Sequence, residues 1–270
     1  MFNKAIQLLE REYINCNNQV KDNEFYKLFA NEKYRHSFQV LGAGNYLIKR
    51  INWLKNKDFK YIEMVKTAIL LHDIFRFEEI IEKYKGNQFF DHGIAGAEYL
   101  RKSTDFSDIR IWLPIKHHGH LIEDLYSDID YINISDEKIK NEIEQICFII
   151  RDADKIANLH LFTNSDKYDE LFLGDIKSEN SGKISKIIAE LAFRYTTTPR
   201  LPSLTSTDKM ISYISWFFDV NFQYSIDFCS KLKVQDKLFT KLRELCSNRE
   251  FADQYISFVS NYLNEHKFLL

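Results

Sequence analysis

Histidine and aspartate recur in the first 160 residues of this sequence at positions where a soluble helix would normally place neither. In ILLHDIFRF, residues 69–77, the pair His72 and Asp73 follows an apolar run. Burying ionisable groups without a compensating charge is costly. A divalent cation removes this cost, because imidazole nitrogen and carboxylate oxygen are suitable ligands for Mn, Fe, Co, Ni, Zn or Mg. The pair therefore indicates a metal centre.

The candidate ligands lie on five separate segments that a fold must bring together. They are His36, the pair His72 and Asp73, His92 in FFDHGIAGAEYL, the histidines of KHHGH at 116–120, and the aspartates of RDADKIANL at 151–159. The adjacent pair cannot share one helix face, since neighbours lie about 100° apart around a helix. At a helix end, however, the two side chains can diverge around one ion, or the aspartate can bridge two.

Helical spacing explains how two of these side chains reach the interior. Apolar residues recur at steps of three and four between residues 61 and 72, and they place His72 on the buried stripe. Between residues 138 and 162 the same spacing places Asp154 on a stripe with Ile146 and Ile150. An aspartate in a core position again indicates a site.

The whole chain favours helices. It has 45% hydrophobic residues but only three prolines and eight glycines among 270 residues, so little interrupts helical patterns. Within the pattern after His36, the small residues Gly42 and Gly44 allow a neighbouring helix to approach closely. Helices are expected at about 2–15, 22–32, 34–54, 76–84, 90–102, 107–118, 184–194, 207–230, 233–246 and 249–266, besides those ending near His72 and covering 138–162.

These patterns predict an all-α fold and a single domain. Residues 1–33 are expected to form N-terminal helices that pack on the core, and 34–162 the metal-binding core. Residues 163–270 are expected to form a C-terminal helical extension of the same domain, entered through a polar stretch at 163–183.

Charge and composition limit the classes of binding partner that we expect. With 37 basic and 39 acidic residues the net charge is −2, so neither a stable nucleic-acid complex nor an anionic membrane is expected. The four cysteines form no C-x-x-C pair, no signal peptide is recognisable, and no apolar run reaches the roughly 20 residues of a membrane span. We expect a cytoplasmic protein, and both a monomer and a homodimer remain open.

Three motifs together resemble the HD superfamily of metal-dependent phosphohydrolases. YRHSFQVLGAGNYLI supplies the first histidine, TAILLHDIFRFEEI the His-Asp pair and IIRDADKIANL the last aspartate. HDIFRF is similar to the HD-I-G-R-F variant of the family motif, with Phe75 where glycine is common. This departure adds bulk beside the site. The resemblance implies a helical bundle of the HD type.

The resemblance also implies the ligands of one or two divalent ions. His36, His72, Asp73 and Asp154 match the ligands of a first ion, and Asp154 is preferred to Asp152 because the family pattern A-D-[KR]-[LI] matches at Ala153 and the residues that follow. Asp152 is then expected beside the ligands or facing the substrate. For a second ion the resemblance implies Asp73 as a bridge, together with His92 and either His117 or His118.

The implied activity is hydrolysis of a phosphate ester of a nucleotide or small metabolite by metal-activated water. His72 and Asp73 would act at the catalytic centre, with cations stabilising the growing charge. The candidate cations are Arg76, Lys116, Arg151 and Lys155, of which Arg76 and Lys155 are the preferred catalytic ones. Two alternatives remain: a di-iron oxygenase on the same fold, and an inactive metal-binding regulatory module.

Overall fold

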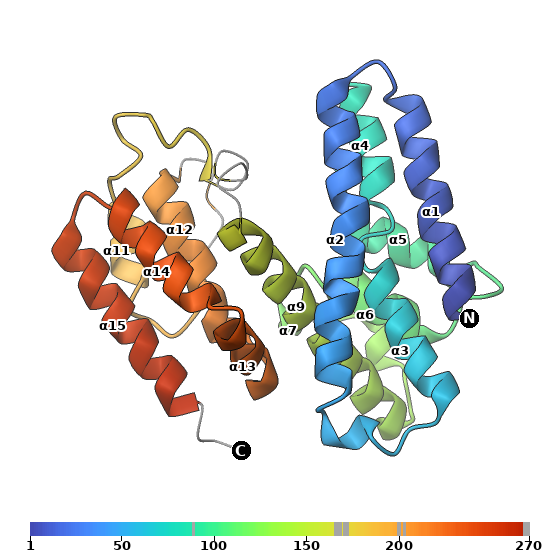
Figure 1. Cartoon of the computed structure of the whole chain (residues 1–270). Coiled ribbons are helices and arrows are strands. Elements are labelled where there is room, and N and C mark those ends of the chain that lie inside the picture. Colours follow the sequence, from blue (N-terminus) through green and yellow to red (C-terminus); the bar gives the residue numbers. More distant parts are fainter. Residues whose placement is uncertain (88–89, 165–168, 170–172, 199–200, 202–203, 267–270) are drawn as a thin grey trace. The chain divides into compact units, whose positions relative to one another are not determined.

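The computed structural model describes residues 1–87, 90–164, 169, 173–198, 201 and 204–266, and its regular elements over these residues are all helical (Figure 1). The all-α prediction is therefore confirmed. Clustering of residue contacts divides the chain into two compact units, Met1–Asp154 and Lys155–Leu270, which we call the N-terminal and C-terminal units. The expected division at residues 33 and 162 stays a prediction.

The N-terminal unit contains the helices up to the middle of α9. They are α1 (Phe2–Gln19), α2 (Glu24–Ile48), the short 3₁₀ turn η1 (Asn52–Leu54), α3 (Phe59–Leu71), α4 (Arg76–Tyr84), α5 (His92–Arg101), α6 (Ile109–His117), α7 (Ile122–Tyr126), α8 (Ile129–Ile132) and α9 (Glu137–Asn164), which runs on into the C-terminal unit.

Helix α2 differs from the sequence-based expectation. Two helices, 22–32 and 34–54, were expected, but a single helix runs through Lys33 and is visible as one long element in Figure 1. It begins at Asn23, whose side chain accepts hydrogen bonds from the backbone N–H groups of Phe25 and Tyr26. No glycine or proline interrupts the chain before Gly42, so the helix continues.

Helix α3 lies in the interior of the N-terminal unit, where it packs against α1, α2 and α6. Its residues Val65, Ala68 and Ile69 are fully buried. A Cβ atom on Gly44 would lie 2.7 Å from Cδ1 of Ile69, so the absence of a side chain lets α2 approach α3. Gly42 has open space around it and plays no such part.

The C-terminal unit consists of α11 (Lys186–Leu191), α12 (Ser206–Ser215), the 3₁₀ turn η3 (Trp216–Asp219), α13 (Gln223–Lys231), α14 (Val234–Leu245) and α15 (Arg249–His266). The expected helix 207–230 is thus interrupted by η3, where the backbone tightens and then extends at Val220. Helix α14 packs against α12, α13 and α15. No helix among the described residues combines the length and apolar character that a bilayer span requires.

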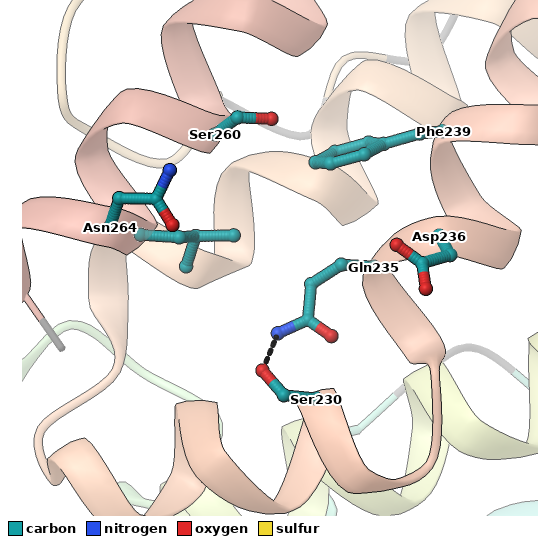
Figure 2. Close-up of a pocket in the computed structure, with 7 residues that line it drawn as sticks. Ser230, Gln235, Asp236, Phe239, Ser260 and Asn264 are labelled. Carbon is teal, nitrogen blue, oxygen red and sulfur yellow. Dashed lines mark hydrogen bonds between the residues drawn. The ribbon is translucent and has the colours of Figure 1, made fainter.

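A hollow of about 300 Å³ lies in the C-terminal unit among side chains of α13, α14 and α15 (Figure 2). The amide of Gln235 donates to the hydroxyl of Ser230 at 2.9 Å, and Phe239 and Asn264 lie on other sides of the hollow. The residues that line it include the carboxylate of Asp236 but no lysine or arginine, so the hollow has none of the cations that bind phosphate.

Candidate metal centre

Two helix ends fix the orientation of two histidine rings. His72 follows the last residue of α3, and His118 follows the last residue of α6. In each ring Nδ1 lies near the carbonyl oxygen three residues earlier, at 2.9 Å from Ile69 and 2.7 Å from Ile115. A carbonyl only accepts hydrogen bonds, so Nδ1 carries the proton and Nε2 of the neutral ring keeps its lone pair. A backbone contact of this kind prepares a histidine to ligate metal.

The first group of side chains joins α2, the end of α3 and α9. Nε2 of His36 lies 2.8 Å from Oδ1 of Asp154, and Nε2 of His72 lies 3.6 Å from the same oxygen. Oδ2 of Asp73 lies 3.7 Å from Nε2 of His72. One ligand atom from each of His36, His72 and Asp73 falls within 4.8 Å of the others. The structure thus brings the four residues of the expected first ion together.

A second group shares Asp73 with the first. Oδ1 of Asp73 lies 3.0 Å from Nε2 of His92 and 3.5 Å from Nε2 of His118, and these two nitrogens are 3.4 Å apart. Helix α5 begins at His92, and Asp91 caps it by accepting from the N–H of Ile94. Because its two oxygens face different groups, Asp73 has the position of a bridging ligand.

The donors fit a divalent cation. Nε2 of His72 is buried and has no hydrogen-bond partner among the described residues, although two carboxylate oxygens lie just beyond hydrogen-bond distance. An unpaired buried polar atom is costly, and a cation between these atoms would satisfy all of them. The site also lies near the carbonyl ends of α3 and α6, where the helix dipole favours positive charge.

The electrostatics of the site point the same way. Burial alone would raise the pKa of Asp73, but the charges of Lys33 and Arg76 and the neighbouring imidazoles hold it well below its usual value. Burial alone would also raise the pKa of Asp154, but the hydrogen bond from His36 and the nearby imidazole of His72 hold it well below its usual value. Both carboxylates are therefore ionised at neutral pH and present negative charge to a cation.

The histidines respond differently to the same surroundings. Burial lowers the pKa of His36 and of His92, which favours the neutral ring that a metal requires. Burial also opposes protonation of His72, but the charges of Asp73 and Asp154 outweigh it and raise its pKa. The two carboxylates therefore favour the protonated ring of His72 when no metal is bound.

Sequence reasoning missed two charged residues at the centre. Nζ of Lys33 lies 3.2 Å from Oδ2 of Asp73. Glu79 is buried and accepts from Nη1 of Arg76 at 2.6 Å, while Nε of Arg76 lies 3.3 Å from Oδ1 of Asp73. Lys33 precedes His36 by three residues and Glu79 follows Arg76 by three, so the helical period was the available signal. The expected interruption of α2 near Lys33 hid the first of them.

Of the two adjacent histidines left open by the sequence, His118 lies in the second group and His117 does not. Nε2 of His117 lies 2.6 Å from Oδ2 of Asp128, and Nζ of Lys116 lies 2.6 Å from the same oxygen. Burial lowers the pKa of His117 despite this carboxylate. His117 and Lys116 therefore form a separate ionic cluster with Asp128.

The other candidate residues have distinct surroundings. Lys155 pairs with Asp219 of η3 at 2.7 Å within the C-terminal unit, and the guanidinium of Arg151 donates to the carbonyl of His120. Asp152 is fully buried. Their expected roles beside the substrate stay predictions.

Phe75, the departure from the family motif, precedes α4 and packs its ring against Tyr99 of α5, with ring centroids 5.3 Å apart. Its Cβ atom would lie 3.6 Å from a Cβ atom on Gly96. The ring of Phe75 therefore packs on α5, and a Cβ atom on Gly96 would come closest to Cγ2 of Ile74, at 3.3 Å.

Comparison with known proteins adds one finding. A family model described as the HD domain matches residues 34–159, a range that includes every residue of both groups. Neither the curated proteins nor the solved structures contain a match to this chain.

Proposed function

Residues 34–159 are an HD domain, and from this premise we propose that the protein hydrolyses a phosphate ester of a nucleotide or another small phosphorylated metabolite. HD domains are generally metal-dependent phosphohydrolases, and the His/Asp groups of this chain have the composition of an HD metal site. The observation that carries the proposal is the convergence of these groups on Asp73, where Nε2 of His72 is buried without a hydrogen-bond partner in the part of the chain that the structure describes.

The residues that would hold the ions follow from the two groups. A first ion would be held by His36, His72, Asp73 and Asp154, and a second by Asp73, His92 and His118. A bound divalent ion makes water acidic enough to attack near neutral pH and polarises the phosphoryl oxygens.

The remaining tasks belong to the protein. Backbone carbonyls hold the rings of His72 and His118 with Nε2 turned inward, so no reorientation is needed when substrate arrives. Glu79 holds one side of the Arg76 guanidinium and leaves its cationic charge beside Asp73. Charge spreads over the phosphoryl oxygens during transfer, and Arg76 is placed to stabilise it.

A metal-by-substrate matrix tests the proposal. Protein loaded with Mn, Fe, Co, Ni, Zn or Mg is incubated with nucleotides and sugar phosphates, and released phosphate and pyrophosphate are measured. We expect release from at least one substrate class and no release by the Asp73→Ala variant, with His117→Ala as the matched control that keeps activity. Full turnover by Asp73→Ala would show that the metal centre is assigned wrongly.

Two other outcomes would replace the proposal. Oxygen consumption by the iron-loaded protein, without phosphate release, would identify an oxygenase. Metal binding without turnover of any substrate in the panel would identify a regulatory module.

A further inference from the structure

Two cations occupy the two oxygens of one buried carboxylate. Lys33 lies at Oδ2 of Asp73, the oxygen that faces His72, and Arg76 lies at Oδ1, the oxygen that faces His92. The Asp73 side chain is only 5% exposed, so both contacts are made in a poorly solvated environment. Each oxygen that would ligate an ion is thus already paired with a protein cation.

The two cations are not held alike. Arg76 has a second carboxylate partner, Glu79, at 2.6 Å, and that pair remains if Asp73 turns to another ligand. Lys33, by contrast, has one carboxylate within ion-pair distance among the described residues, that of Asp73. The Lys33 side chain is 19% exposed and carries its charge on a flexible four-carbon stem, so its ammonium group can move without a change in the helix.

A divalent ion in the first group would displace Lys33 from Asp73. Asp73 and Asp154 together balance the charge of one such ion, which leaves the ammonium of Lys33 next to a cation and without a negative partner. An ammonium group and a divalent ion beside the same carboxylate repel each other strongly where little water is present. The ammonium then needs a new anion close to the ion, and its three donors suit the oxygens of a phosphoryl group.

We propose that Lys33 is the phosphoryl-binding residue of this centre: it neutralises Asp73 in the metal-free protein, and it binds the anionic group of the substrate once an ion has taken its place. The proposal rests on the proposed function for the identity of the anion. It adds a binding residue and an exchange of partners to that function. It also explains why a lysine lies one helical turn from His36, with its charge directed at a metal-ligating oxygen.

The exchange predicts opposite changes in two affinities when the charge is removed. In Lys33→Met, which keeps the length of the stem, Mn²⁺ should bind about five- to tenfold more tightly because no cation competes for Asp73. Inorganic phosphate should bind the Mn²⁺-loaded variant at least about tenfold more weakly. Isothermal titration calorimetry of the full chain measures both, without any need for turnover.

Two further variants make the test specific. Lys27→Met removes a lysine of the same helix that pairs with the exposed Glu24, and it should change neither affinity. Lys33→Arg keeps the charge, and it should restore phosphate binding to within a few-fold of the original protein. If Lys33→Met fails to fold, Lys33→Gln replaces it in both titrations.

The proposal is wrong if Lys33→Met binds phosphate as tightly as the original protein, or if it binds Mn²⁺ more weakly. It is also wrong if the Mn²⁺-loaded original protein binds no phosphate. The proposed function is tested separately. If phosphate binding depends on Lys33 but the protein hydrolyses no ester, the hydrolase function is wrong and the phosphate-binding role of Lys33 stands. If the protein hydrolyses an ester and Lys33→Met binds phosphate as the original protein does, the function stands and the role of Lys33 is wrong.

Discussion

Each unit of this protein buries a carboxylate almost completely, but the two carboxylates have different partners. In the C-terminal unit, Oδ1 of Asp208 accepts from the N–H of Ser185 at 2.9 Å and Oδ2 from the N–H of Thr205 at 3.1 Å. In the N-terminal unit, the oxygens of Asp73 face side-chain cations and imidazoles. Asp208 is thus satisfied by the backbone that it organises, whereas Asp73 is arranged to interact with positive charge.

The difference shows why burial of a polar residue does not by itself indicate a site. Thr205 and Asp208 form a capping box, in which the Thr205 hydroxyl accepts from the N–H of Asp208 at 3.0 Å, and this box starts α12. Both oxygens of Asp208 are thus satisfied by backbone N–H groups, although the nearby hydroxyl of Ser185 has no hydrogen-bond partner among the described residues. Around Asp73, by contrast, three imidazoles lie within 4 Å of the carboxylate oxygens, and Nε2 of His72 is buried without a hydrogen-bond partner in the described part of the chain. The imidazoles gathered around the carboxylate separate the functional cluster from the structural one.

The largest expected effect is that of Asp73→Asn, which keeps the shape of the side chain and removes its charge. We expect turnover of any substrate found to fall at least about a thousandfold, because the bridging ligand of both groups is lost. Metal content measured by atomic emission should fall with it. Asp208→Asn is the matched control. Equal loss of metal in both variants would contradict the assignment of Asp73, and not Asp208, to the metal centre.

Metal removal should affect the two units unequally. At a free-ion concentration a thousandfold above Kd, binding stabilises the folded state by about 4 kcal/mol. Hydrogen exchange with and without a chelator should therefore change for the backbone of residues 69–73 and 115–118, which end α3 and α6 at the centre. The amides of residues 205–208 should exchange at the same rate in both conditions. A uniform change along the chain would contradict a local metal centre.

The adjacent histidines repeat the contrast within one unit. His118→Ala should weaken binding of a second Mn²⁺ at least about 10- to 100-fold, the loss known for residues that merely support a ligand. His117→Ala should leave that affinity within about threefold, since its Nε2 is engaged by Asp128. Competitive titration against a fluorescent chelator measures both. A larger loss of affinity in His117→Ala than in His118→Ala would show that His117, and not His118, is the ligand of the second ion.

Asp208→Asn should lower the free energy of unfolding of the C-terminal unit by about 2 kcal/mol, because its amide nitrogen cannot accept from one of the two N–H groups. Urea unfolding followed by circular dichroism measures the change. Metal affinity should be the same as in the original protein. A loss of metal affinity together with stability would mean that the capping box supports the centre.

The sequence predicted the parts of the centre that depend on local periodicity. Apolar stripes identified the buried faces that carry His72 and Asp154, and the structure places these side chains 3.6 Å apart. The HD motifs identified the domain that the family model matches at residues 34–159. Both signals are carried by residues close together in the chain, so no knowledge of the tertiary fold was needed.

The remaining features depend on where helices end and which helices meet. Successive residues of a helix point about 100° apart, so the choice between His117 and His118 depends on how the end of α6 faces α5. Lys33 became recognisable only once α2 was seen to run through it. The expected helix 207–230 is interrupted at η3, but the sequence contains no proline or glycine there from which this interruption could have been predicted.

The smallest expected effect concerns Glu142, a buried carboxylate of the N-terminal unit whose two oxygens are paired within the protein. Oε1 accepts from Nζ of Lys57 at 2.6 Å and Oε2 from Nη1 of Arg110 at 3.0 Å. Burial would raise the pKa of Glu142, but these two cations lower it below its ordinary value. Glu142 therefore has a lysine and an arginine as partners, as Asp73 does, but no imidazole of the described residues lies within ion-pair distance of its oxygens.

A lowered pKa means that the folded state favours the ionised carboxylate, so its contribution to stability is present above the unfolded pKa of about 4.3 and is lost as the pH falls through the lower folded pKa. Glu142→Gln should thus reduce the free energy of unfolding by about 1.5 kcal/mol at pH 7 and by progressively less below pH ~4.3. Urea titrations at several pH values measure this difference. Because no ligand is involved, the difference should be the same with and without Mn²⁺. A metal-dependent difference would mean that the presence of neighbouring imidazoles fails to separate functional from structural carboxylates.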